Sequence, residues 1–159
     1  MPKTRARNSA EAPTTPVQAV RDCADALSRA AAECCRQHDR VARLHAKSDI
    51  DEELKVGSEA CDQCHDALRT FASAYERTAA DVHPTGSDEE WWHRANALWL
   101  ASREYLRRNG GCDQASRALK EHGPDRLDSL HMEYELEASA LLALKQAADA
   151  YQQNRPAAA

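Results

Sequence analysis

Apolar and small residues recur along this chain every three or four positions, a spacing that places them on one face of an α-helix. The pattern predicts long helices over residues 16–47, 50–82, 87–109 and 125–153, with a short extra helix over 113–122. Four amphipathic helices joined by short turns are typical of an all-α four-helix bundle. In this bundle we expect the first two helices to form a long antiparallel hairpin.

Capping residues mark the predicted helix ends. Thr15 and Gln18 have the spacing of a capping box before the first helix, and Ser87 and Glu90 have it before the third. The paired glycines at 110–111 predict the end of the third helix, because glycine is favoured just beyond a helix C-terminus.

Alanine dominates the apolar residues of the chain. There are 31 alanines, against five valines, one isoleucine and one phenylalanine. Strands are built largely from β-branched and aromatic residues, so this composition excludes an all-β fold. Because an alanine side chain buries little apolar area, we expect modest stability unless a metal, a cross-link or self-association contributes.

The two ends of the chain differ in composition from its middle. Residues 1–14 are basic and rich in proline, threonine and alanine, and we expect them to form a disordered tail. Residues 154–159 are expected to form a second disordered tail. The helical pattern between them, over 15–153, predicts a single bundle domain.

The charge and the apolar pattern of the chain disfavour two classes of partner, nucleic acids and membranes. The net charge is −5 and the isoelectric point is near 5.8, which disfavours nucleic-acid binding driven by bulk charge. The sequence lacks both the ~20 apolar residues needed to span a bilayer and a secretory signal. We therefore expect a cytoplasmic protein without a membrane partner, and the six cysteines fit a reducing compartment.

A cysteine and histidine cluster is expected on the first hairpin. If the turn is centred near Ser48-Asp49, Cys34 and His38 on the first helix lie level with Cys61 and Cys64 on the second. Three thiols and an imidazole match the donors of a tetrahedral Zn²⁺ site, and thiolates also suit Cu(I). The predicted function is therefore metal binding, with a structural, storage or sensing role.

Other interpretations of the same residues stay open. Cys35 and His65 lie at the edges of the apolar faces of their predicted helices. They are expected either to replace one of the four ligands or to contact the ligands from outside. Two alternatives are that the thiols are plain core residues, since free cysteine packs as a small apolar side chain, or that they form a disulfide. Cys61-x-x-Cys64-His65 also has the spacing of a c-type haem attachment site.

A metal-free interaction protein is the alternative function. Trp91 and Trp92 are adjacent at the start of the third predicted helix and could anchor a protein partner or a second copy of the chain. The sequence contains no phosphate-binding loop or nucleophile elbow, so a non-enzymatic role is expected.

A recurring arginine–histidine spacing indicates an enzyme as a second alternative function. Histidine follows arginine by five residues at three places, Arg40/His45, Arg117/His122 and Arg126/His131. The spacing is similar to the arginine–histidine motif of HEPN nucleases, which are small, all-α and usually dimeric. The resemblance implies RNA cleavage, with Arg126 and His131, at the start of the last predicted helix, as the best-placed pair.

Overall fold

The computed structural model describes residues 15–46 and 51–155 and confirms the all-α bundle. The chain forms α1 (Pro16–His45), α2 (Asp51–Ala79), α3 (Glu89–His122) and α4 (Leu127–Gln153). Short 3₁₀ turns, η1 (Gly86–Asp88) and η2 (Pro124–Arg126), precede α3 and α4. The predicted turn at Ser48-Asp49 lies outside the described residues, as do residues 1–14 and 156–159 of the predicted tails.

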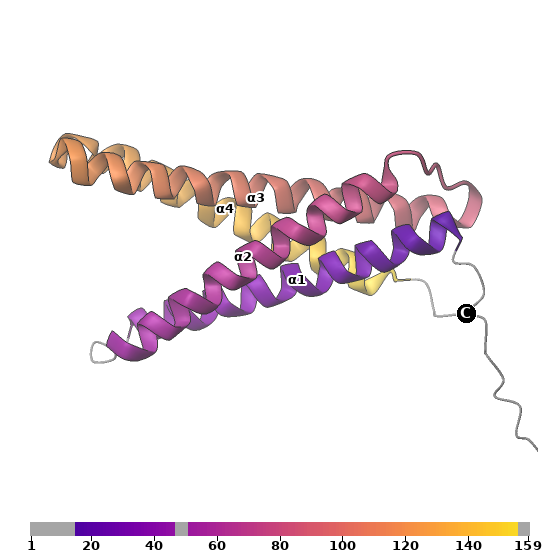
Figure 1. The fold of residues 1–159 in the computed structure, drawn as a ribbon, viewed down its shortest axis with the longest axis horizontal. Coiled ribbons are helices and arrows are strands. Elements are labelled where there is room, and N and C mark those ends of the chain that lie inside the picture. The colour runs from indigo at the N-terminus through magenta and orange to yellow at the C-terminus, as the bar shows by residue number, and fades with distance from the viewer. Residues whose placement is uncertain (1–14, 47–50, 156–159) are drawn as a thin grey trace, which may run out of the picture.

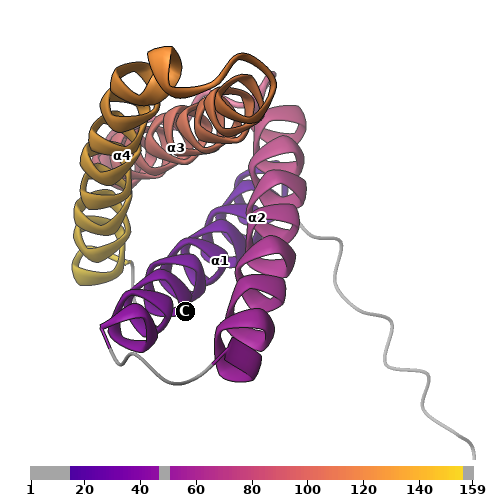
Figure 2. The same cartoon turned by 90° about the vertical axis from the view of Figure 1, so that its left-hand side faces the viewer.

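The four helices are arranged as two antiparallel hairpins, α1 with α2 and α3 with α4. The hairpins lie together at the end where α2 leads into α3, and they diverge toward the opposite end (Figure 1). Viewed from the diverging end, the α1–α2 pair and the α3–α4 pair form separate sides of the bundle (Figure 2). A ligand that contacts both hairpins would therefore connect the two halves of the molecule.

The first helix begins as predicted, with half of the expected capping box. The Thr15 hydroxyl accepts a hydrogen bond from the Gln18 backbone amide at 3.2 Å. The Gln18 side chain does not return this bond, because it donates instead to Asp22 at 2.9 Å. One free amide at the helix N-terminus is thus satisfied by the Thr15 side chain.

The predicted helix end at Gly110-Gly111 and the separate helix over 113–122 are wrong. α3 runs without interruption from Glu89 to His122, and it ends before Gly123, whose φ is +79°. Each glycine inside a helix costs only about 1 kcal/mol relative to alanine, and the packing of α3 along α4 outweighs that cost. The absence of a side chain at Gly111 also leaves space for Glu133 of α4.

The core combines small residues with three buried tyrosines. Tyr75, Tyr105 and Tyr151 are at most 1% exposed, among alanines and leucines from all four helices. Each tyrosine hydroxyl reaches a polar group on another helix; Tyr151, for example, donates to Asp25 of α1 at 2.8 Å. The aromatic rings supply volume that alanine lacks, while the hydroxyls link specific pairs of helices.

Candidate metal centre

Two histidines and a tyrosine converge in the interior of the bundle. The Nε2 atoms of His38 on α1 and His65 on α2 lie 3.1 Å apart. The hydroxyl of Tyr105 on α3 lies 2.5 Å from the His38 Nε2 and 2.8 Å from the His65 Nε2. Three polar atoms from three helices thus surround one point.

Cys34 completes this group from one helical turn before His38. The Cys34 sulfur and the ring nitrogens of His38 and His65 lie within 4.8 Å of one another. Cys34 is fully buried. Because residues four apart share a helix face, Cys34 and His38 present sulfur and nitrogen to the same point.

The hairpin register decides which residues of α2 face this point. Cys23 contacts Thr78, and His38 contacts His65, so His65 lies level with the α1 pair. Cys61 is buried and Cys64 is half-buried, and the group whose ligand atoms converge consists of Cys34, His38 and His65. All six cysteines lie in the described residues, and all six are free thiols.

The hydrogen bonds among the three polar atoms cannot all be made by neutral groups. An imidazole Nε2 has one in-plane position, which either carries a proton or accepts one. The Tyr105 hydroxyl can donate to one ring and accept from the other. The 3.1 Å contact between the His38 and His65 nitrogens is then left without a proton of its own.

Burial keeps the two rings neutral. Desolvation lowers the pKa of His38 and of His65, and the neighbouring His38 lowers the pKa of His65 further. The Glu137 carboxylate opposes both shifts, without reversing either. An imidazolium that would bridge the two nitrogens with a proton is therefore disfavoured. When both neutral rings carry their proton on Nδ1, both Nε2 lone pairs are available to a metal ion.

The thiols beside the histidines are protonated at neutral pH. Desolvation raises the pKa of Cys34 to about 12 and raises the pKa of Cys61 and Cys64 as well. Burial also raises the pKa of Tyr105. A thiol in this state is a poor nucleophile, but a metal ion supplies the positive charge that a thiolate ligand needs.

A carboxylate on α4, Glu137, lies close enough to the cluster for its charge to affect the pKa of both histidines. Glu137 accepts hydrogen bonds from the Asn109 amide at 2.8 Å and from the Cys112 thiol at 3.4 Å. Desolvation, followed by the charge of Glu137, raises the pKa of Cys112 to about 12. Glu137 therefore adds negative charge near the histidines while its oxygens are engaged by α3.

The other predicted residues lie elsewhere. Cys35 is buried against α4, where the charges of Lys145 and Asp149 act on it. Trp91 is only 4% exposed and donates a hydrogen bond to the Tyr151 hydroxyl, which makes it a core residue. Trp92 is half-buried and remains accessible.

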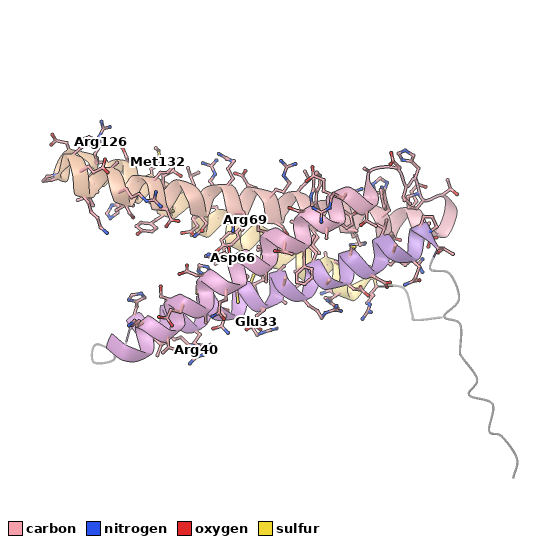
Figure 3. All side chains as sticks on the ribbon, viewed as in Figure 1. Glu33, Arg40, Asp66, Arg69, Arg126 and Met132 are labelled. Atoms are coloured by element: carbon pink, nitrogen blue, oxygen red, sulfur yellow. The ribbon has the colours of Figure 1, made fainter. Side chains whose placement is uncertain are left out.

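The arginine and histidine of the nuclease-like spacing lie far from the cluster. Arg126 and His131 are both exposed where α4 begins. Figure 3 shows Arg126 at the outer end of the second hairpin, whereas Asp66, the neighbour of His65, lies midway along the molecule. RNA cleavage by Arg126 and His131 stays a prediction that these positions do not test.

Sequence reasoning missed Tyr105 as a member of the site. Its spacing on α3 is that of an ordinary core residue. No pattern indicates which turn of α3 lies level with His38, because the crossing of the two hairpins sets that height. His65 carried a visible signal, as the histidine that follows Cys61-x-x-Cys64.

No protein-family model matches the chain, and no curated protein or solved structure is significantly similar to it. Within the described residues, no helix is both long and apolar enough to cross a membrane.

Proposed function

We propose that this protein binds one transition-metal ion, Zn²⁺ or Cu(I), through Cys34, His38 and His65. The observation that carries the proposal is the 3.1 Å approach of two neutral imidazole nitrogens inside the bundle. A metal ion between them accepts both lone pairs and removes the unsatisfied contact. The Cys34 sulfur lies beside the same point and adds a soft donor.

The separation of the nitrogens fits a metal centre. Two Zn–N bonds of about 2.0–2.1 Å in tetrahedral geometry hold their nitrogen atoms roughly 3.3 Å apart. The 3.1 Å between the His38 and His65 nitrogens is close to that value. The Cys34 sulfur lies within 4.8 Å of the ring nitrogens.

A fourth donor is available from two directions. Cys61 and Cys64 lie on the same hairpin and supply a second thiolate if one of them turns toward the ion. The Tyr105 hydroxyl already lies within hydrogen-bond distance of both histidine nitrogens. A second thiolate would complete the two-sulfur, two-nitrogen set of a structural Zn²⁺ site, and soft thiolates also suit Cu(I).

The position of the site supports a structural role for the ion. Its donors come from α1 and α2, and Tyr105 extends the site to α3 of the other hairpin. Metal ligation stabilises small domains whose apolar core is thin, and this core is built largely from alanine. Storage and sensing use the same donors and differ in how readily the ion leaves.

Elemental analysis tests the proposal. The full chain is purified under reducing conditions without chelator, loaded with Zn²⁺ or Cu(I), and freed of unbound metal. We expect about one ion per chain in the wild type and in Cys23→Ser, which removes a thiol of α1 that contacts Thr78 instead of the cluster. Cys34→Ser and His65→Ala should each lose the ion.

Two results contradict the proposal. Absence of metal from the loaded wild type would show that the cluster is only a hydrogen-bonded core. Retention of the metal in His65→Ala, with loss in the Cys61→Ser/Cys64→Ser double variant, would instead assign the ion to Cys34, His38, Cys61 and Cys64. Circular dichroism of each variant shows whether the bundle is still folded.

A further inference from the structure

A second site, independent of the metal centre, lies where α2 crosses α3 (Figure 1). An open pocket of about 230 Å³ is formed there between the C-terminal part of α2 and the N-terminal half of α3. Seven residues line it: Tyr75, Glu76, Ala79, Ala80, Trp92, Asn96 and Trp99. The two alanines leave the space, and three aromatic rings bound it.

The aromatic rings are held in place by the core. Tyr75 is 1% exposed, and its hydroxyl donates to the Asn96 side chain at 2.9 Å. The Tyr75 ring centre lies 6.4 Å from that of Trp92 and 6.5 Å from that of Trp99, each with an interplanar angle of 42°. Trp92 also packs against the buried Trp91. The pocket is therefore preformed, with little side-chain entropy left to lose on binding.

The rim of this pocket already attracts a cation. The guanidinium carbon of Arg103 lies 5.1 Å from the centre of the Trp99 ring. The same guanidinium approaches the Glu76 carboxylate to 3.7 Å. Both side chains are more than half exposed, at 56% and 54%, so this contact is weak and Arg103 is free to move aside.

We propose that this pocket binds a small quaternary ammonium compound of the choline type. The faces of aromatic rings attract cations, and rings arranged around a hollow are a common means of holding alkylated ammonium groups. Glu76 is the carboxylate that complements the positive charge. The pocket volume of about 230 Å³ lies below the roughly 300–1,000 Å³ that is typical of pockets for drug-sized ligands. The ligand is therefore expected to be smaller than a drug-sized molecule.

Titration with choline tests the proposal, with calorimetry and tryptophan fluorescence as readouts. The comparison ligand is the neutral isostere, in which a quaternary carbon replaces the ammonium nitrogen. We expect choline to bind at least about tenfold more tightly, because the neutral compound lacks the cation–π and carboxylate attraction. Glu76→Gln should reduce that preference several-fold.

A variant that gains affinity for choline provides a control, because misfolding would lower the affinity instead of raising it. Arg103→Gln removes the chain's own cation from Trp99 and Glu76, so choline should bind several-fold more tightly to this variant. Arg107→Gln, one turn farther along and paired with Glu104, should leave the affinity unchanged. Equal affinity for choline and the isostere, no binding at millimolar concentration, or weaker binding to Arg103→Gln would each overturn the proposal.

Discussion

At the scale of single residues, the most informative feature is the contact of Tyr105 with two histidines. Its hydroxyl is the only described partner, apart from the other histidine, that satisfies the His38 and His65 nitrogens. A buried polar group without a partner costs about 1–3 kcal/mol, so the three side chains depend on each other. The same dependence makes the cluster testable without metal.

We expect Tyr105→Phe to lower the free energy of unfolding of the metal-free protein by about 1–3 kcal/mol, because the histidines lose their hydroxyl partner. Tyr134→Phe is the matched control, since Tyr134 is 48% exposed on α4. Urea denaturation measures both. An equal, small effect of the two substitutions would show that the hydroxyl of Tyr105 is not satisfying the histidines.

Zinc affinity should rise with pH. Burial lowers the pKa of both histidines, so they are neutral above about pH 6.5 and contribute no proton release there. The Cys34 thiol, with a pKa of about 12, is protonated at neutral pH and must lose its proton to bind. The apparent association constant should therefore increase about tenfold per pH unit between about pH 7 and pH 9.

Chelator competition across this pH range measures the slope. If Tyr105 also binds as a phenolate, the wild type releases two protons and the slope doubles, while Tyr105→Phe restores the single-proton slope. Affinity that does not change with pH would exclude a thiolate from Cys34 as a ligand.

At the scale of elements, the two adjacent glycines in α3 show how packing overrides a local stop signal. Neither Gly110 nor Gly111 has positive φ, and both continue the helix. A β-carbon at Gly110 would meet no atom within 4 Å, whereas one at Gly111 would lie 2.7 Å from the Glu133 Oε2. The two positions therefore differ in space, although their backbone conformation is the same.

Alanine substitution separates the two glycines. Gly110→Ala should stabilise the protein by about 0.5–1 kcal/mol, because alanine loses less backbone entropy in a helix. Gly111→Ala should stabilise it less, since Glu133 must move to another rotamer. Thermal unfolding measures both, and destabilisation by Gly110→Ala would show that the helix ends at this position.

At the scale of the whole molecule, several polar links join the two hairpins. Among them, Tyr75 bonds to Asn96, Tyr105 bonds to the histidines, and Tyr151 of α4 bonds to Asp25 of α1. The proposed metal ion, held by α1 and α2 beside Tyr105 of α3, would add a further link between the two hairpins. Metal binding should thus stabilise the whole bundle.

Zinc at a free concentration about 100 times its dissociation constant should stabilise the folded protein by about 2.7 kcal/mol. For a chain of 159 residues this raises the midpoint of thermal unfolding by roughly 5–10 °C. Magnesium, which prefers oxygen donors, should have no effect, and neither should zinc on Cys34→Ser. An equal shift in Cys34→Ser would place the stabilising ion elsewhere.

The sequence by itself determined α1, α2 and α4, but it did not determine the length of α3. Helical spacing and the Thr15 cap are local properties, so they predict α1 and α2 to within a few residues. The sequence also selected Cys34 and His38, because residues four apart on one helix share a face whatever the rest of the fold does.

Only the tertiary structure decided what those two residues meet. The register of α1 against α2 brought His65 to the His38 nitrogen, and a shift of two residues along a helix moves a side chain by about 3 Å and turns it to another face. The crossing of the hairpins brought in Tyr105, which no spacing along the chain relates to His38. Helix formation depends on neighbouring residues, whereas register and crossing depend on how whole faces of side chains pack together.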